Sequence, residues 1–169
     1  MTRVLILLGS NIDRERSLCQ AARRLNELVR VIAFSPVYET EPIGDIDQMC
    51  FFNAAALIDT DLEPVRLKVD ILHRIEDELG RVRSPNKNAP RTLDLDIILY
   101  GDRICSVEGR PVPDPDLLQY AHVARPAADL APEWVHPEAG ETLETIAARL
   151  PVSGLQRRPD IVLSECNDE

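Results

Sequence analysis

The sequence of residues 93–100, Leu-Asp-Leu-Asp-Ile-Ile-Leu-Tyr, carries the strongest strand signal of the chain. Apolar residues alternate with two acids at its start, and Gly101-Asp102 marks a turn at its end. The preceding residues 64–80 have apolar residues at helical spacing, with Pro64 in the first turn and Gly80 after the last. We therefore expect a helix that leads into a strand. The expected cap of this helix is Thr60 or Asp61, and its expected buried face is Val65, Val69, Leu72, Ile75 and Leu79.

Further elements lie on the N-terminal side of this helix. Residues 51–58 form an apolar run typical of a strand. Segment 31–39 is rich in β-branched and aromatic residues, but Pro36 cannot donate to a sheet ladder and indicates an edge strand or a bulge. The apolar run 4–8 predicts a central strand, and apolar residues recur at helical spacing after Asp13, the expected N-cap of a first helix.

The order of these elements is strand, helix, strand, strand, helix, strand. It predicts an α+β fold with a ferredoxin-like βαββαβ core, in which two helices cover one face of a four-stranded antiparallel sheet. Several prolines break residues 111–151 into short pieces, of which 142–150 is the clearest helix. We expect one domain over residues 1–169, with a core at about 3–132 and a C-terminal extension of short helices and loops at 133–169.

Composition disfavours several functional classes. The 169 residues carry a formal net charge of −10, which disfavours nucleic-acid binding because such binding depends on Lys and Arg at phosphates. No segment approaches the ~20 apolar residues of a membrane span, and the apolar run 4–8 is too short for a secretory signal. We expect a cytoplasmic protein with small-molecule partners and no nucleic acid or membrane partner. We favour a monomer, although the sequence does not determine the oligomeric state.

The four cysteines, at positions 19, 50, 105 and 166, are widely spaced and include no Cys-x-x-Cys pair. This spacing fits neither a zinc site nor a disulfide framework. We expect all four to be reduced thiols with structural roles.

A concentration of positive charge precedes the strand at 93–100. Residues 81–91, Arg-Val-Arg-Ser-Pro-Asn-Lys-Asn-Ala-Pro-Arg, contain four cations and no acid in a chain that is otherwise acidic. Asp94 and Asp96 follow, and strand alternation places both carboxylates on one face. Paired carboxylates suit Mg²⁺, so the segment predicts a polyphosphate site and phosphoryl or pyrophosphoryl transfer. The alternative is that the cations form a solvated loop and the acids are caps or surface groups.

Phe51 and Asn53 form a second pair, at the start of the strand 51–58. Their side chains point the same way and are suited to a flat heterocycle, with the ring held by stacking and its edge by hydrogen bonds. The alternative is a core phenylalanine beside a polar residue at the end of a strand.

Four motifs follow one another along the chain. They are Leu8-Gly9-Ser10-Asn11, Ser-Pro-Val-Tyr-Glu-Thr-Glu-Pro-Ile-Gly at 35–44, Phe52-Asn53-Ala54-Ala55, and the segment 80–96. Together they resemble the 6-hydroxymethyl-7,8-dihydropterin pyrophosphokinases, from about Val4 to Pro132. The resemblance implies a ferredoxin-like core and transfer of pyrophosphate from ATP to the hydroxymethyl group of the pterin, with release of AMP, in folate biosynthesis.

The resemblance also implies roles for individual residues. Asp94 and Asp96 would hold two Mg²⁺ ions that bridge the phosphates of ATP, which is the co-substrate. Arg81 and Arg91 would stabilise charge on the transferring group and bind ATP. The other implied ATP contacts are Glu76, Arg83 and Lys87, and the implied pterin contacts are Thr40, Pro42, Ile43, Phe51, Asn53 and His122.

The chain departs from the family pattern at two places. Lys87-Asn88-Ala89 stands where the family usually has Arg-Trp-Gly, and Asp114 and Tyr120 stand where it has an ATP-contacting His and an Arg. His122 takes the place of the second aromatic residue that stacks on the pterin. With an ordinary pKa of ~6.5, a stacking His122 predicts that pterin affinity weakens between pH 8 and pH 6.

Two other functions stay open on the sequence. One is a paralogue that acts on a modified pterin, as in a methanopterin-type pathway. The other is a catalytically silent ferredoxin-like binding module, which the presence of both acids and of Arg81 and Arg91 disfavours.

Overall fold

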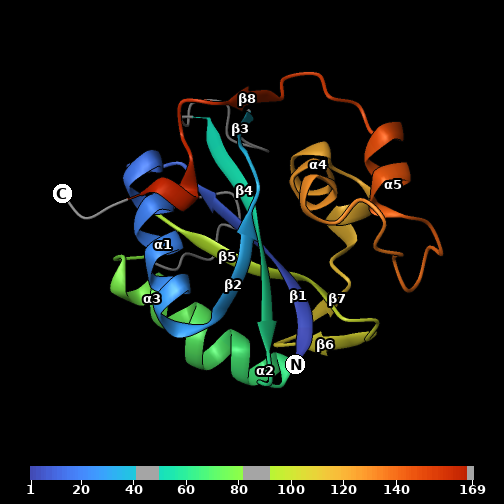
Figure 1. The fold of residues 1–169 in the computed structure, drawn as a ribbon, viewed down its shortest axis with the longest axis horizontal. Helices are drawn as coiled ribbons and strands as arrows, with labels where there is room; N and C mark the ends of the chain where they lie inside the picture. Colours follow the sequence, from blue (N-terminus) through green and yellow to red (C-terminus); the bar gives the residue numbers. More distant parts are fainter. Residues whose placement is uncertain (41–49, 82–91, 167–169) are drawn as a thin grey trace.

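The computed structural model of the chain describes residues 1–40, 50–81 and 92–166. Its main sheet is antiparallel, with the strand order β5-β1-β4-β3-β8 and with β2 also paired to β4 (Figure 1). A separate hairpin pairs β6 with β7. The strands are β1 (Thr2–Ser10), β2 (Arg30–Phe34), β3 (Val37–Thr40), β4 (Phe51–Thr60), β5 (Asp94–Tyr100), β6 (Cys105–Val107), β7 (Arg110–Val112) and β8 (Gln156–Arg158).

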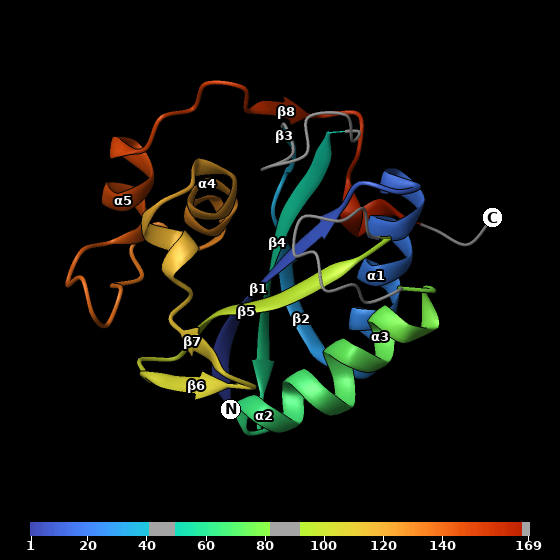
Figure 2. The same cartoon turned by 180° about the vertical axis from the view of Figure 1, so that it is seen from behind.

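Helices lie on both sides of the sheet, as Figures 1 and 2 show from opposite directions. The first group is α1 (Arg14–Leu28), α2 (Pro64–Arg66), the π-helical η1 (Leu67–Leu72) and α3 (His73–Glu78). The second is the 3₁₀ helix η2 (Pro115–Leu118), α4 (Ala121–Leu130) and α5 (Leu143–Arg149), and a further 3₁₀ helix, η3 (Leu163–Glu165), follows β8. None of the helices in the described residues is long and apolar enough for a membrane span. The predicted α+β fold with an antiparallel sheet is confirmed.

The apolar run at the start of the chain is buried on both faces. Val4 and Ile6 of β1 pack in one cluster with Leu18 of α1, whereas Leu5 packs in a second cluster with Val123 of α4. Each of these side chains is at most 1% exposed. A strand with both faces covered needs apolar residues at successive positions, which explains the continuous run. The prediction that residues 4–8 form a central strand is confirmed.

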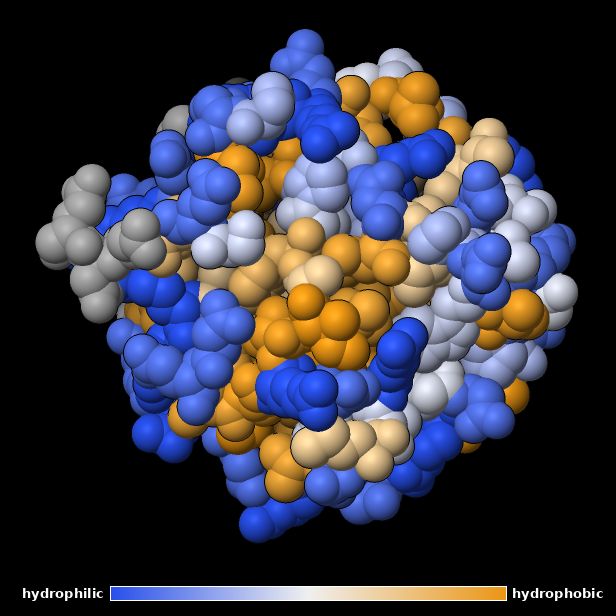
Figure 3. Space-filling model, viewed as in Figure 1, coloured by the Kyte–Doolittle hydropathy of each residue, from blue (hydrophilic) through white to orange (hydrophobic). Residues whose placement is uncertain are grey.

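The predicted edge segment 31–39 divides at Pro36 into β2 and β3, both of which pair with β4. Ser35 bridges the break, because its N–H donates to Ala55 O at 2.8 Å and its Oγ accepts from Ala55 N at 2.7 Å. Figure 3 shows apolar side chains gathered over β2 and β4, and Ile32 of β2 is 42% exposed. Pro36 lacks an N–H and cannot donate to a strand ladder, which fits its position at the break between β2 and β3.

One predicted helix start is confirmed and the other is wrong. Asp13 is the N-cap residue of α1 as predicted, although its backbone is left-handed and its side chain makes no capping hydrogen bond. The second helix begins at Pro64 with Glu63 in the cap position, so the prediction of Thr60 or Asp61 is wrong. The reason is that β4 extends to Thr60, whose Oγ1 accepts from Leu62 N at 3.1 Å in the following turn.

The predicted buried face of the second helix is partly wrong. Val65 and Val69 are 48% and 42% exposed, whereas Leu67, Leu72 and Ile75 are fully buried. Residues 67–72 form a π-helical turn, in which hydrogen bonds join residues five apart. The wider turn changes the angle between successive side chains around the helix axis. A regular 3.6-residue spacing that fits the residues after the turn therefore assigns Val65 and Val69 to the buried face incorrectly.

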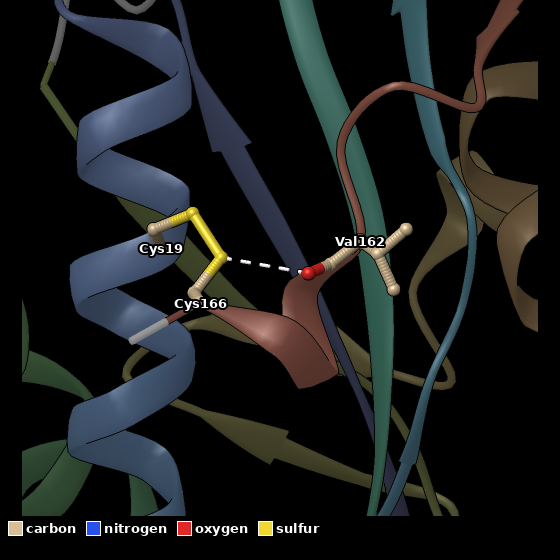
Figure 4. The surroundings of a disulfide bond; sticks show 3 residues. All are labelled: Cys19, Val162 and Cys166. Carbon is tan, nitrogen blue, oxygen red and sulfur yellow. Dashed lines mark hydrogen bonds between the residues drawn. A yellow bond between two sulfur atoms is a disulfide. The ribbon is translucent and has the colours of Figure 1, made fainter. Parts of the chain in front are cut away.

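The C-terminal segment contributes a strand and a covalent link. β8 pairs with β3, and η3 lies beside α1 (Figure 1). Cys166 forms a disulfide with Cys19 of α1, and its Sγ also lies 3.6 Å from Val162 O (Figure 4). The prediction that all four cysteines are reduced is therefore wrong for this pair. A separation of 147 residues gives no local spacing signal, and it is the fold that brings these thiols together.

Candidate active site at one end of the sheet

Several predicted site residues meet where β1 ends and β4 and β5 begin. Gly9 of β1 pairs with Asn53 on one side and with Asp94 on the other, and Asn53 pairs with Tyr38 of β3. Directly paired residues of an antiparallel sheet project to the same face. A Cβ atom on Gly9 would lie 3.3 Å from Asn53 Oδ1, so the absence of a side chain there leaves space between Asn53 and Asp94.

The two acids lie on one face of β5, as the alternation predicts, because Leu95 and Ile97 point into the core on the other face. The side chains of Asp94 and Asp96 are 24% and 14% exposed. Burial, and then the charge of Asp94, raise the pKa of Asp96 to about 6. A divalent cation bound here would offset this repulsion, and carboxylate oxygens are the ligands that Mg²⁺ prefers. The acids therefore fit Mg²⁺, although the described residues contain no group of three or more His, Cys, Asp or Glu side chains able to hold a metal.

Arg81 lies against the first of these acids, Asp94. Its Nη1 donates to Asp94 Oδ1 at 2.6 Å and to Leu93 O at 3.3 Å, and it also contacts Glu76 Oε2. Burial lowers the pKa of Arg81, but the carboxylates of Asp94 and Glu76 outweigh burial and the net shift is upward. The guanidinium thus stays charged within reach of any group that binds at Asp94.

Glu76 is 1% exposed and joins α3 to β5. Its Oε2 accepts from Leu95 N at 3.2 Å and from Arg81, and its Oε1 lies 3.2 Å from His73 Nδ1. These contacts place the start of β5 and the Arg81 guanidinium together. A direct contact of Glu76 with adenosine stays a prediction.

The π-helical turn η1 places a further cation beside the acids. Lys68 Nζ lies 3.4 Å from Asp96 Oδ1 and donates to Leu95 O. π-helical turns often occur at functional sites, and here the turn brings a lysine to the edge of β5. Lys68 lowers the cost of ionising Asp96, although burial and Asp94 outweigh it.

Asn53 has the features expected of a ligand-binding amide. Asn53 is 5% exposed, and its side-chain Nδ2 has no hydrogen-bond partner among the described residues. Buried donors in native proteins are nearly always hydrogen-bonded, so an unpaired one requires an explanation. Phe51, the first residue of β4, pairs with Thr40 and shares a face with Asn53. An amide donor next to an aromatic ring suits the edge of a flat heterocycle.

Tyr38 closes the row on the far side of Asn53. Its hydroxyl donates to Asp129 Oδ2 near the end of α4, and it is 8% exposed. Burial, and then this hydrogen bond, raise the pKa of Tyr38. The pair fixes α4 against β3 next to Asn53.

His122 lies in the first turn of α4, and its ring stacks on that of Tyr120 with 5.3 Å between centroids. Burial lowers the pKa of His122 to about 4. A pKa near 4 leaves the imidazole neutral from pH 8 to pH 6, which argues against the predicted pH dependence of pterin binding in this range. A ring position opposite Phe51 stays a prediction.

Some predicted site residues lie outside the described residues. These are Pro42, Ile43, Arg83, Lys87 and Arg91. Their roles stay predictions, as do those of the described residues Thr40, Phe51 and Asn53.

Comparison with known proteins assigns this chain to a family. The sequence model of the family described as 7,8-dihydro-6-hydroxymethylpterin-pyrophosphokinase (HPPK) matches residues 5–132, which is well over half of the chain. This chain belongs to the HPPK family. The match begins within β1, covers the rest of the main sheet except β8, and includes all the site residues above.

Curated relatives extend over most of the chain. A protein of Pseudomonas aeruginosa named 2-amino-4-hydroxy-6-hydroxymethyldihydropteridine pyrophosphokinase is 42% identical over 161 residues, which cover 93% of this chain and 97% of the relative. A protein of the same name from Bacillus subtilis is 41% identical, covering 79% of this chain and 80% of the relative. The folic acid synthesis protein fol1 of Schizosaccharomyces pombe is 36% identical over 88% of this chain, which spans 20% of that protein.

Solved structures agree with the fold. The Plasmodium falciparum HPPK-DHPS A437G with STZ-DHP superposes with a TM-score of 0.70 at 14% identity, covering 88% of this chain and 45% of that one. The wild-type protein with pteroate gives a TM-score of 0.65 over 42% of its length. This chain thus spans less than half of these HPPK-DHPS structures and shares the fold of that part.

Sequence reasoning missed two charged groups near Asp96. Lys68 reaches Asp96 only through the π-helical turn, which no periodicity reveals. Arg110 and Asp114 form a salt bridge with 2.7 Å between Nη2 and Oδ2, so the departure at Asp114 is a buried acid with a partner. Arg110 and Asp114 are four residues apart, a spacing that predicts a salt bridge only within a helix, and Arg110 lies in a strand.

Proposed function

We propose that this chain transfers pyrophosphate from ATP to the hydroxymethyl group of 6-hydroxymethyl-7,8-dihydropterin, with AMP as the second product, in folate biosynthesis. Membership of the HPPK family makes it an ATP-dependent diphosphotransferase. The row Asn53, Gly9 and Asp94 is the observation that carries the assignment of the site. Two inter-strand spacings, roughly 10 Å, separate the backbones of Asn53 and Asp94. A pterin edge at Asn53 and a polyphosphate at Asp94 then leave the hydroxymethyl group between them.

The reaction needs positioning and charge neutralisation more than a protein nucleophile. The hydroxymethyl oxygen attacks the β-phosphorus of ATP, the bond from that phosphorus to the oxygen shared with the α-phosphate breaks, and the hydroxyl proton is lost. Negative charge grows on the oxygens of the transferring group, so nearby cations accelerate the step. We assign this role to Arg81, whose guanidinium would leave Asp94 and bind the transferring group, and we assign the same role to Arg91.

We assign Asp94 and Asp96 as the ligands of two Mg²⁺ ions. Bound Mg²⁺ supplies neutralisation of the polyphosphate charge. The pairing of β5 with β1 fixes the backbone positions of the two acids, with Asp94 beside Gly9 and Asp96 beside Leu7. Lys68 lies next to Asp96 and limits the negative charge of the site when both acids are ionised.

The remaining assignments follow from the resemblance. ATP contacts are Glu76, Arg81, Arg83, Lys87 and Arg91, and pterin contacts are Thr40, Pro42, Ile43, Phe51, Asn53 and His122. We propose one domain over residues 1–169 that acts in the cytoplasm on these small molecules, without nucleic acid or membrane, as a monomer. Neither the paralogue for a modified pterin nor the silent binding module is favoured by the comparisons.

The test is a purified reaction of ATP, 6-hydroxymethyl-7,8-dihydropterin and Mg²⁺, followed by chromatography of the nucleotides. We expect AMP in proportion to the modified pterin. ADP as the product would indicate a simple kinase, and no nucleotide product would support the silent module. The same assay with a methanopterin-type hydroxymethyl pterin tests the paralogue, which a higher kcat/KM on that substrate would support.

A further inference from the structure

Asp114 is a buried acid that the proposed mechanism does not use. It precedes η2, is 2% exposed, and its N–H donates to Ile98 O of β5 at 3.0 Å. Its Oδ1 accepts from Asp116 N at 3.0 Å. The backbone and one carboxylate oxygen are thus fixed to the sheet and to η2. The other oxygen, Oδ2, is available to hold a further group.

That group is the guanidinium of Arg110, the first residue of β7. Its Nε and Nη2 donate to Asp114 Oδ2 at 3.0 and 2.7 Å, and Nη2 also lies 3.5 Å from Asp116 Oδ2. Nη1 takes part in none of these contacts. A free arginine side chain samples many rotamers, at an entropy of about 2 kcal/mol, and a fixed carboxylate removes much of that freedom before any ligand binds.

The guanidinium borders a cavity of about 150 Å³ next to Asp96, which has room for about five water molecules. Its other charged lining residues are Lys68, Asp96 and Glu108, and its apolar wall includes Ile97. Burial lowers the pKa of Arg110, but Asp96 and then Asp114 outweigh burial and raise it. Arg110 and Asp96 therefore lie within electrostatic reach of each other across the cavity.

We propose that Asp114 is a positioning residue that holds Arg110 at this cavity, so that Arg110 binds the polyphosphate of ATP beside Asp96. This inference rests on the proposed function for the identity of the ligand. A phosphate oxygen suits Nη1, which donates to neither Asp114 nor Asp116, because guanidinium N–H groups form strong charge-assisted hydrogen bonds with phosphate. The Asp114 carboxylate holds the opposite edge, through Nε and Nη2.

The experiment measures binding of an unreactive ATP analogue by calorimetry, and KM and kcat in the AMP assay. A charge-assisted hydrogen bond contributes about 1.5–3 kcal/mol, so Arg110→Ala should weaken analogue binding and raise the KM for ATP by roughly tenfold or more. Asp114→Asn keeps the size and the acceptor for Asp116 N–H but removes the charge. It should shift ATP affinity in the same direction by a smaller factor, with kcat changed by less than about twofold.

The double variant distinguishes positioning from an independent role. If Asp114 acts through Arg110, then Asp114→Asn in the Arg110→Ala background should produce no further loss of ATP affinity. Arg110→Lys keeps the charge but loses the two-donor contact, so it should fall between the parent and Arg110→Ala. Arg103→Ala is the control, because Arg103 pairs with Glu63 at the protein surface.

Several results would overturn the proposal. They are additive losses in the double variant, an Asp114→Asn protein that melts earlier but binds the analogue like the parent, and Arg110→Lys or Arg110→Ala with parental affinity. The calorimetric measurement needs no turnover. A parent that binds the analogue through Arg110 but releases no AMP would contradict the proposed reaction and leave the Arg110 contact supported.

Discussion

Asp94 accepts a hydrogen bond from Arg81 at 2.6 Å, so a cation and Arg81 use the same carboxylate. Because Asp94 has this dual role, removal of its charge alone should strongly lower kcat. Asp94→Asn and Asp96→Asn keep the side-chain size and remove the charge, and each should lower kcat by on the order of 100-fold or more while the protein stays folded. AMP formation at saturating Mg²⁺ and circular dichroism measure the two properties.

Asp102→Asn is the control for these variants, because Asp102 is an exposed acid beyond the other end of β5. It should keep parental turnover. Near-parental turnover of either Asp94→Asn or Asp96→Asn would show that the acids are not metal ligands.

Asn53 offers a separate test of the pterin subsite. Asn53→Ala should weaken pterin binding by roughly tenfold or more, because a buried hydrogen-bonding group of the ligand then loses its partner, at about 1–3 kcal/mol. The unfolding free energy should change little, since Nδ2 has no partner among the described residues. Calorimetry with an unreactive ATP analogue present measures the pterin affinity. Asn26→Ala, on the exposed face of α1, should bind pterin normally, and equal affinities of the two variants would remove Asn53 from the site.

The residues that could be predicted are those whose placement follows from strand alternation. Asp94 with Asp96, and Phe51 with Asn53, share faces because their positions differ by two on one strand. Lys68 and Arg110 reach the same site through a π-helical turn and a hairpin, whose geometry depends on tertiary contacts. Charge in the sequence indicated a polyphosphate site, but it did not indicate which cations lie within reach of each acid.

At the scale of elements, the segment 64–80 shows why a pattern fails. Its existence as a helix that leads into β5 was predictable from Pro64, Gly80 and the apolar spacing. Its buried face was not, because the π-helical turn at 67–72 changes the angle between successive residues, leaving Val65 and Val69 exposed. The same turn brings Lys68 to Asp96, so the irregularity belongs to the site as well as to the helix.

His122 in α4 should make the stability of the protein depend on pH. Burial lowers its pKa to about 4, from an ordinary value of 6.5, so the unfolded chain takes up a proton first as the pH falls. The contribution of His122 to the unfolding free energy is complete above about pH 6.5 and decreases as the pH falls from 6.5 to 4. Below pH 4 it causes no further change. It amounts to roughly 3 kcal/mol, from 1.36 kcal/mol for each unit of pKa.

His122→Phe should remove this contribution. Urea unfolding gives the unfolding free energy of the parent and of the variant at pH 7.5 and at pH 4.5. The contribution of His122 is the decrease between these two pH values in the parent minus the same decrease in the variant. The parent should lose more stability than the variant on acidification. Equal losses would show that the imidazole is solvated and that its pKa is ordinary.

At the scale of the whole molecule, the C-terminal segment joins parts of the sheet and helix layers that are distant in sequence. β8 pairs with β3, and Arg158 binds Glu39 of β3 at 2.6 Å. The prediction of short helices and loops at 133–169 did not include this strand. Gln156–Arg158 has three polar residues and no apolar alternation, so only the presence of β3 gives it strand structure.

The disulfide between Cys19 and Cys166 predicts a redox dependence of stability for the whole chain. It joins residues 147 apart, and in the chain-entropy account closing a loop of that size in the unfolded state stabilises the folded protein by up to about 5 kcal/mol. Cys19→Ser, or treatment of the parent with dithiothreitol, should therefore lower the unfolding free energy by several kcal/mol. Cys50→Ser is the matched control, because Cys50 is a free thiol, and it should respond to dithiothreitol as the parent does. Alkylation under denaturing conditions followed by mass spectrometry counts the thiols, with two expected before reduction, from Cys50 and Cys105, and four after. Four alkylated thiols without reductant, or equal unfolding free energies of parent and Cys19→Ser, would mean that η3 is held beside α1 by packing alone.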